Sequence, residues 1–320
     1  MTPPTTPTKA RRMRELLKKG TVASPGVYDG YSVRMVEKMG FEAANTSGAG
    51  LSNTRLGLPD VGILSLMENV DACRQIVNST SLPLIADADT GYGNAVTVYH
   101  TVQYFEQAGV VGINLEDQVS PKRCGHMRGK AVIDAREMCK KLEAAAKAKK
   151  DPDFIINART DVIAVEGFDA AVKRCKMYLA AGADLAYADA VESEDQIKRL
   201  VDAVGPGIVS VNMGFGIRSR PTTPTLSFKK LAQLGVARVS IPRMLPSAAL
   251  MGMKNALALM KQSIETGEVF DRPDMLVGIE EITELMGYAL INQLEKDFSL
   301  EEDLEKRYKG DVDLVVRAGH

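Results

Sequence analysis

Eight short apolar runs alternate with longer helical stretches along most of this chain, and this alternation limits the fold more than any other feature. The predicted strands are Val22–Gly26, Ala43–Ser47, Leu82–Ala86, Val110–Leu115, Phe154–Ala158, Leu185–Ala188, Ile208–Val211 and Val239–Ile241. The predicted helices between them are Tyr31–Met39, Val96–Gln107, Ala135–Lys149, Ala170–Ala181, Asp195–Val204 and Ser227–Leu234. Eight strands that alternate with helices predict a parallel (β/α)8 barrel of the TIM type. An open doubly wound sheet is the alternative, but it favours a G-x-G-x-x-G turn after the first strand, where this chain reads SPGVYDG.

The two ends of the chain are expected to lie outside this barrel. The sequence predicts four parts: a disordered lead (1–8), the barrel (9–246), C-terminal helices (247–300) and a tail (301–320). The C-terminal helices, predicted over Ala248–Ser263 and Ile279–Lys296, are rich in methionine and leucine and are expected to pack within the subunit or against a neighbour.

The segment Lys9–Lys19 carries basic residues around three apolar positions and predicts a short amphipathic helix. Two roles remain open for it. It either closes one end of the barrel or, being rich in arginine and poor in acid, targets the protein to a mitochondrion.

Composition excludes several classes of protein. Hydrophobic residues make up 45% of the chain and charged residues 25%, which is the balance of a globular domain. A net charge of −1 gives no overall field that would attract nucleic acid or an anionic membrane. The four cysteines show no metal-type spacing and are expected to be reduced thiols of a cytosolic protein.

Polar residues close one predicted strand after another. In a β/α barrel the functional groups gather where the strands end. The residues at these ends are Ser47, Gly48, Asp87, Asp89, Glu116, Asp117, Arg159, Asp161, Asp189, Asn212, Pro242 and Arg243. We therefore expect most of them to line a single site.

Asp87 and Asp89 lie two residues apart, so an extended backbone points both carboxylates the same way. Like charges at close range repel unless they share a cation or a proton. Hard oxygen ligands suit Mg²⁺, with Mn²⁺ as a substitute, and Glu116 could join through a water. The alternative is that one of the two aspartates caps the next helix.

The segment Ser120–Ala131 (SPKRCGHMRGKA) contains four basic residues, a histidine and no acid around Cys124. Cationic neighbours prepare a thiol to exchange a proton near neutrality, and such a loop can close over an anionic substrate. The alternative is a solvated basic loop with an incidental cysteine.

Arg159 ends an otherwise apolar strand, so it needs either a carboxylate ligand or an internal acid such as Asp161. Residues 47–50 (SGAG) offer a hydroxyl and backbone N–H groups that suit a carboxylate, although a plain tight turn explains them almost as well.

Five motifs carry a resemblance to a known family: LGLPD (56–60), DADTGYG (87–93), LEDQ (115–118), KRCGH (122–126) and ARTD (158–161). Together they resemble the isocitrate lyase/phosphoenolpyruvate mutase superfamily over roughly residues 14–296, and KRCGH is typical of its short-chain lyases. The phosphonate mutases have a different loop at that place, so phosphorus–carbon chemistry is not expected. The resemblance implies a β/α barrel that forms a homotetramer, with its last helices swapped between subunits.

The resemblance also implies roles for individual residues. Asp87, Asp89 and Glu116 would hold Mg²⁺, and Cys124 would protonate the departing carbanion. Either Asp60 or Tyr28 would help the substrate hydroxyl lose its proton. The remaining implied site residues are Lys122 and His126 on the catalytic side, and Ser47, Gly48, Ala49, Gly125, Arg159, Asp189, Asn212 and Pro242 on the substrate-binding side.

The implied activity is a Mg²⁺-dependent carbon–carbon lyase that cleaves a 2-hydroxy di- or tricarboxylate, of the 2-methylisocitrate or 2,3-dimethylmalate type, to a 2-oxo acid such as pyruvate. Two departures from the lyases matter. Asp189 stands where they usually have glutamate, which has a longer reach, and residues 212–221 (NMGFGIRSRP) replace a T-E-F-G-like segment of methylisocitrate lyases. The resemblance implies that this second segment contacts the distal end of the substrate, so it counts against methylisocitrate itself.

Two other functions stay open. An oxaloacetate acetylhydrolase shares KRCGH but tends to carry serine where this chain has Val162. The second is a catalytically silent barrel that binds a ligand or serves assembly. The expected location is the cytoplasm, with the mitochondrial matrix as the alternative.

Overall fold

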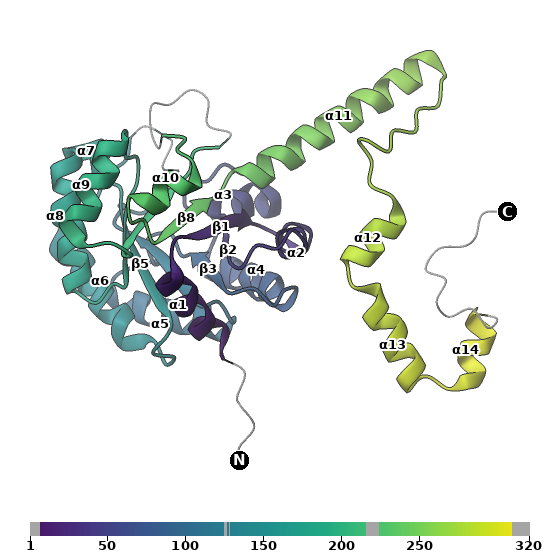
Figure 1. The fold of residues 1–320 in the computed structure, drawn as a ribbon, viewed down its shortest axis with the longest axis horizontal. Helices are drawn as coiled ribbons and strands as arrows, with labels where there is room; N and C mark the ends of the chain where they lie inside the picture. Colours follow the sequence, from purple (N-terminus) through teal and green to yellow (C-terminus); the bar gives the residue numbers. More distant parts are fainter. Residues whose placement is uncertain (1–6, 125–126, 128, 216–223, 309–320) are drawn as a thin grey trace. The chain divides into compact units, whose positions relative to one another are not determined.

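The computed structural model describes residues 7–124, 127, 129–215 and 224–308, and its central feature is a closed barrel of eight parallel strands (Figure 1). The strands are β1 (Val22–Val27), β2 (Ala44–Thr46), β3 (Leu84–Asp87), β4 (Gly112–Glu116), β5 (Ile155–Thr160), β6 (Leu185–Ala188), β7 (Val209–Asn212) and β8 (Arg238–Ile241). Each strand pairs with its neighbours in chain order, and β8 pairs with β1 to close the barrel. The predicted TIM-type fold is confirmed, and the strand limits differ from the predicted ones by at most two residues.

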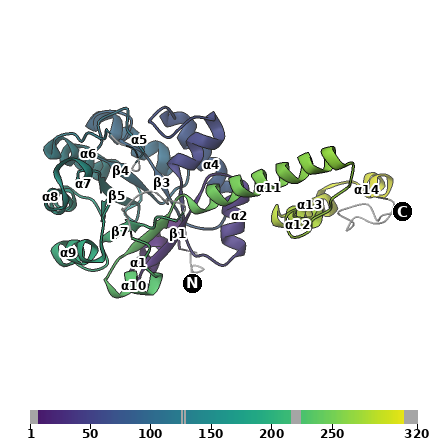
Figure 2. The same ribbon diagram turned by 90° about the horizontal axis from the view of Figure 1, so that it is seen from above.

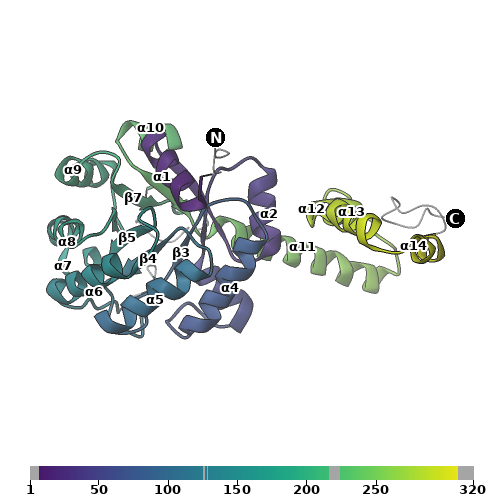
Figure 3. The same ribbon diagram turned by 90° about the horizontal axis from the view of Figure 1, so that it is seen from below.

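Helices surround the strands when the barrel is seen from above and from below (Figures 2 and 3). They are α1 (Lys9–Lys19), α2 (Gly30–Lys38), α3 (Gly48–Leu51), α4 (Leu66–Asn78), α5 (Ala95–Gln107), α6 (Ala135–Ala148), α7 (Ile163–Glu166), α8 (Phe168–Ala180), α9 (Glu194–Val204) and α10 (Phe228–Gln233), with a π-helical turn η1 (Ser52–Leu56) after α3. Side-chain caps fix where many of them begin: Ser65 and Glu68, for example, form a capping box at the start of α4.

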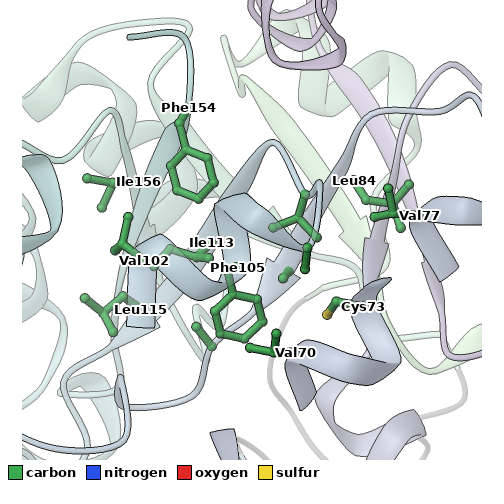
Figure 4. Close-up of a cluster of buried hydrophobic side chains, with 14 of the residues drawn as sticks. Val70, Cys73, Val77, Leu84, Val102, Phe105, Ile113, Leu115, Phe154 and Ile156 are labelled. Carbon is green, nitrogen blue, oxygen red and sulfur yellow. The ribbon is translucent and has the colours of Figure 1, made fainter. Parts of the chain in front are cut away.

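The largest core cluster packs helices α4 and α5 against β3 and β4 (Figure 4). Phe105 of α5 is fully buried against this sheet surface, together with Val70 and Cys73 of α4. Because strands of a parallel barrel are covered on the outside and filled on the inside, they read as continuous apolar runs, which is why the sequence reveals them.

Helix α1 closes the end of the barrel at which the strands begin. Its Met13 is fully buried in a cluster with Val22, Ile85 and Ile155, which lie at or near the starts of their strands. Arg14, the next residue, also holds the helix to the barrel through an ion pair of 2.8 Å to Asp184. Of the two roles considered for Lys9–Lys19, the structure therefore supports the closing of one end of the barrel.

The chain divides after Ser247 into two compact units. The second unit contains most of α11 (Met244–Thr266), followed by α12 (Ile279–Leu285), α13 (Tyr288–Phe298) and α14 (Glu301–Tyr308). The prediction of one helix over Ile279–Lys296 is wrong, because Gly287 adopts a left-handed conformation (φ 78°) that separates α12 from α13. The predicted tail begins with α14. Among the described residues, no helix is long and apolar enough to span a bilayer.

Candidate active site

A pocket lies where the strands end, and it collects side chains from β2 through β8. Its lining residues are Asn45, Thr46, Ser47, Gly48, Ala49, Asp60, Asp87, Asn114, Lys122, Cys124, Arg159, Tyr187, Asp189, Asn212, Ser240, Pro242 and Arg243. Most of the strand-end residues are therefore brought together, as expected. Asp89, Glu116, Asp117 and Asp161 do not line this pocket.

The turn after β2 forms one wall of this pocket. Ser47 begins α3, and its Oγ accepts a hydrogen bond of 3.0 Å from the N–H of Gly50. Gly48 lies against the carboxylate of Asp87: a Cβ atom at position 48 would come within 2.5 Å of Asp87 Oδ2. The Thr46 hydroxyl holds Asp87 from the backbone side by accepting its N–H at 2.9 Å.

Asp89 follows Asp87 in a turn with positive φ (47°), and its side chain is buried. Lys122 Nζ lies 2.9 Å from Asp89 Oδ1 and 2.5 Å from Asp60 Oδ1. The Asp89 contact has ion-pair distance but not hydrogen-bond geometry, so Asp89 Oδ1 has no aligned donor. Burial raises the pKa of Asp89 to about 6, and neighbouring Asp87 acts in the same direction while Lys122 opposes it.

Glu116 is turned toward other partners. The parallel register sets it opposite Arg159, whose Nε lies 3.2 Å from Glu116 Oε2. Gln118 donates to Glu116 Oε1 at 3.0 Å. Burial raises the pKa of Glu116 well above its ordinary value, despite the opposing charge of Arg159.

These residues fit a hard divalent cation through two carboxylates rather than three. Asp87 and Asp89 supply oxygen donors, and a buried oxygen of Asp89 has no aligned hydrogen-bond donor. Over the described ranges, no group of three His, Cys, Asp or Glu side chains lies close enough to form a complete set of ligands. Glu116 therefore fits only the indirect role through water that the sequence suggested.

Cys124 is buried in the pocket wall, and its cationic neighbour is not the one that the sequence predicts. Arg243 Nη2, beyond the end of β8, lies 2.8 Å from Cys124 Sγ. The lysines of the basic loop point elsewhere: Lys122 pairs with the aspartates described above, and Lys130 lies 2.6 Å from Asp161 and 2.9 Å from Asp189. The backbone N–H of Cys124 donates to the carbonyl of Asp60 at 3.1 Å. This bond holds the basic loop against the segment that follows η1.

Arg159 pairs with an internal acid, Asp161, which the sequence offered as the alternative to a carboxylate ligand. Its guanidinium donates to Asp161 at 2.7 and 2.9 Å and lies 3.4 Å from Asp189. Burial alone would lower the pKa of Arg159, but the charges of Asp161, Asp189 and Glu116 raise it well above its ordinary value.

Asp189 also has partners within the protein for its carboxylate. It accepts from Lys130 and, at 2.8 Å, from the hydroxyl of Tyr187. Burial would raise the pKa of Asp189, yet Arg159 and Lys130 outweigh burial and hold that pKa well below its ordinary value.

The remaining predicted residues divide into three groups. Asn212 and Pro242 line the pocket, and Asn212 accepts a hydrogen bond from the Ser240 hydroxyl. Tyr28 is half-buried but does not line the pocket, and burial together with Asp29 raises its pKa. Gly125 and His126 lie outside the described residues.

Several pocket residues escaped the sequence analysis, and most of them follow one rule. Asn45, Asn114, Tyr187 and Ser240 each stand two positions before a predicted site residue, so the alternation of a strand points them to the same side. Reading two residues back from each strand end would have found them. Arg243 has no such signal toward Cys124, because the two lie 119 positions apart in the chain.

Known proteins are similar to this chain in both sequence and fold. The family model described as phosphoenolpyruvate phosphomutase matches residues 13–261. The chain is 38% identical to 2,3-dimethylmalate lyase of Eubacterium barkeri over 291 residues, which cover 91% of this chain and 98% of that protein. It is 37% identical to 2-methylisocitrate lyase of Shewanella oneidensis over 275 residues, which cover 86% of this chain and 91% of that one.

Two solved structures are similar over nearly their whole length. Oxaloacetate acetylhydrolase bound to the inhibitor 3,3-difluorooxalacetate superposes with a TM-score of 0.83 and 28% identity, over 91% of this chain and 97% of that one. Phosphonopyruvate hydrolase in complex with oxalate and Mg²⁺ superposes with a TM-score of 0.79 and 28% identity, over 91% and 99% of the two chains. With its motifs, barrel and relatives in agreement, this chain belongs to the phosphoenolpyruvate phosphomutase family, within the isocitrate lyase/phosphoenolpyruvate mutase superfamily.

Proposed function

We propose that this protein is a Mg²⁺-dependent carbon–carbon lyase that cleaves a 2-hydroxy di- or tricarboxylate into a 2-oxo acid and a second carboxylate. The lyase class agrees with the names of its relatives, 2,3-dimethylmalate lyase and 2-methylisocitrate lyase. The observation that carries the proposal is the position of Cys124: a buried thiol, in contact with a guanidinium, in the same pocket as Asp87 and the Ser47–Ala49 turn.

Asp87 and Asp89 would hold Mg²⁺, with Glu116 assisting through water. When bound, the ion would polarise the hydroxyl and carboxylate oxygens of the substrate. A structure of this fold is known with Mg²⁺ and oxalate, which is consistent with this assignment.

The chain's own residues would bind and orient the substrate. The Ser47 hydroxyl and the N–H groups of Gly48 and Ala49 would receive one carboxylate. Arg159 lines the pocket from β5, and we place Asp189 behind it as a positioning residue, because Asp189 already contacts Arg159, Lys130 and Tyr187.

Proton transfer would use Asp60 and Cys124, which line the pocket and are joined by a backbone hydrogen bond. Asp60 lines the pocket and Tyr28 does not, so Asp60 is the better candidate to accept the proton of the substrate hydroxyl. Lys122, 2.5 Å away, would orient it. As the C2–C3 bond breaks, its electron pair moves to the leaving fragment, and the carbon of that fragment takes the proton of Cys124.

Assembly is the second part of this proposal. Along α11, five exposed apolar residues recur at alternating spacings of three and four: Leu250, Met253, Leu257, Met260 and Ile264. Such a stripe is typical of a helix that packs against a partner helix. We propose that a second copy of the chain covers it within a homotetramer, in the cytoplasm or the mitochondrial matrix.

An NMR survey of products tests the activity. The purified protein would be offered 2,3-dimethylmalate, 2-methylisocitrate, other 2-alkylmalates and oxaloacetate, each with Mg²⁺ and with a chelator. A 2-oxo acid that forms only with the metal supports the lyase and identifies its substrate. If none of these acids gives a product and the protein does not bind Mg²⁺ together with a 2-oxo acid, the result would favour the catalytically silent barrel instead.

The hydrolase is the second candidate, favoured by the similarity to oxaloacetate acetylhydrolase. The Val162 argument against it gains no support, because the Val162 side chain is packed in the core beside Phe168 and does not line the pocket. Oxalate and acetate from oxaloacetate would assign the protein to that branch.

A further inference from the structure

Among the described residues, three cationic side chains line the pocket, and two of them are already paired with carboxylates of the protein. Lys122 contacts Asp60 and Asp89, and Arg159 contacts three carboxylates. Their charges are used to hold the site together, so neither carries an unmatched charge toward an incoming anion.

Arg243 differs from both. Over the part of the chain that the structure describes, its one polar side-chain contact is the hydrogen bond of 2.8 Å to Cys124 Sγ, and no carboxylate there lies within ion-pair distance of it. A guanidinium in a pocket wall is costly to desolvate unless an anion accompanies it. The pocket therefore holds one positive charge that a bound anion would balance.

The contact of Arg243 with Cys124 indicates which anion Arg243 would bind. If Cys124 gives its proton to the carbon of the leaving fragment, that carbon lies beside the sulfur. The carboxylate attached to the same carbon takes up the negative charge as the bond breaks, so it lies one bond farther on. A guanidinium in contact with the sulfur is placed to receive these two oxygens in the paired geometry that arginine forms with carboxylates.

We infer that Arg243 binds the second carboxylate of the substrate, the one on the fragment that Cys124 protonates, and so makes the site specific for dicarboxylates. The inference rests on the proposed function for the role of Cys124. It assigns the recognition of the second carboxylate to the residues that follow β8, two strands around the barrel from the Ser47–Ala49 turn, which follows β2.

Binding of malate and of lactate tests this assignment without any need for turnover. The two acids share a 2-hydroxy carboxylate and differ in the second carboxylate. Dissociation constants would be measured by titration with NMR detection, with and without Mg²⁺, for the wild type, Arg243→Met, Arg243→Lys and Arg136→Met. Arg136 is a matched control, because its side chain is 86% exposed on α6, outside the pocket.

We expect the wild type and Arg136→Met to bind malate at least about 10-fold more tightly than lactate, the effect of a charge-assisted hydrogen-bonded pair. Arg243→Met should lose most of that preference while its affinity for lactate stays within about 2-fold. Arg243→Lys, which keeps the charge and loses the paired geometry, should lie between them.

Two results would overturn the inference: an unchanged malate preference in Arg243→Met, or an equal loss of affinity for both acids. Either is separable from a failure of the proposed function. If no 2-hydroxy acid is cleaved but the preference depends on Arg243, the lyase proposal fails and the binding site stands. If cleavage occurs and the preference survives in Arg243→Met, the inference alone fails.

Discussion

Gly48 and Asp87 are in such close contact that position 48 has no space for a side chain. A Cβ atom there would lie 2.5 Å from Asp87 Oδ2 and 3.1 Å from its Cγ. The nearest obstacle is thus the end of a short side chain and not the backbone. A methyl group at this position would push the carboxylate aside before it disturbed the barrel.

Gly48→Ala should therefore lower metal affinity and leave the fold intact. We expect the affinity for Mn²⁺, measured by electron paramagnetic resonance, to fall by about 10-fold or more, since one good ligand is displaced. The melting temperature should change by only a few degrees. Gly252→Ala is the control, because a Cβ atom at Gly252 meets nothing within 4 Å. Unchanged Mn²⁺ binding in Gly48→Ala would argue against Asp87 as a ligand.

Cys124→Ser should separate binding from chemistry. A hydroxyl is a much weaker acid than a thiol, so turnover should fall by a factor on the order of 10²–10⁴. Oxalate, which needs no proton from Cys124, should bind the variant as it binds the wild type. Cys139→Ser is the control, because Cys139 lies half-buried on α6 outside the pocket. Full activity in Cys124→Ser would rule out the acid role.

Asp189→Asn should reduce stability in a manner that depends on pH. The pKa of Asp189 lies below its value in the unfolded chain, so its stabilising effect is complete above about pH 4 and is lost as the pH falls through the native pKa. Breaking a buried ion pair costs about 3 kcal/mol or more. Urea unfolding should show that deficit at pH 7 and a smaller one at pH 3.

The exposed pair of Asp202 and Lys198 provides the comparison for that experiment. Both side chains are 60% exposed, so Asp202→Asn should change the free energy of unfolding by less than about 1 kcal/mol. A deficit in Asp189→Asn that is equal at the two pH values would show that its ion pairs do not stabilise the fold.

Met13→Ala tests whether α1 is part of the barrel. Met13 is fully buried beneath the strands, so its truncation should lower the free energy of unfolding by about 2–5 kcal/mol, as measured with urea. Met39→Ala is the control, because Met39 is 68% exposed. Equal stability of the two variants would mean that α1 adds nothing to the core.

The sequence predicted the barrel well because each strand is buried on both faces. Leu185–Ala188 was predicted with the limits it has in the structure, and the others shifted by the one or two residues over which a strand end is locally ambiguous. The C-terminal helices were harder to predict. Apolar spacing continues across Gly287, and only the left-handed backbone there separates α12 from α13.

The site was predictable wherever a role is local to one strand end, as for Ser47, Asp87 and Arg159. It was not predictable where partners come from distant strands. The basic loop suggested that its own basic residues accompany Cys124, but its two lysines form ion pairs with buried aspartates instead. The cation on the sulfur comes from Arg243, and only closure of the barrel brings the two together.

The position of α1 also has a practical consequence. The described chain enters the barrel unit at the face where the strands begin, and the pocket opens at the face where they end. An affinity tag, a fusion partner or a surface linker attached ahead of Thr8 therefore joins the barrel unit on the side away from the pocket. Immobilising the enzyme through its first residues should leave substrate access through the strand ends unobstructed.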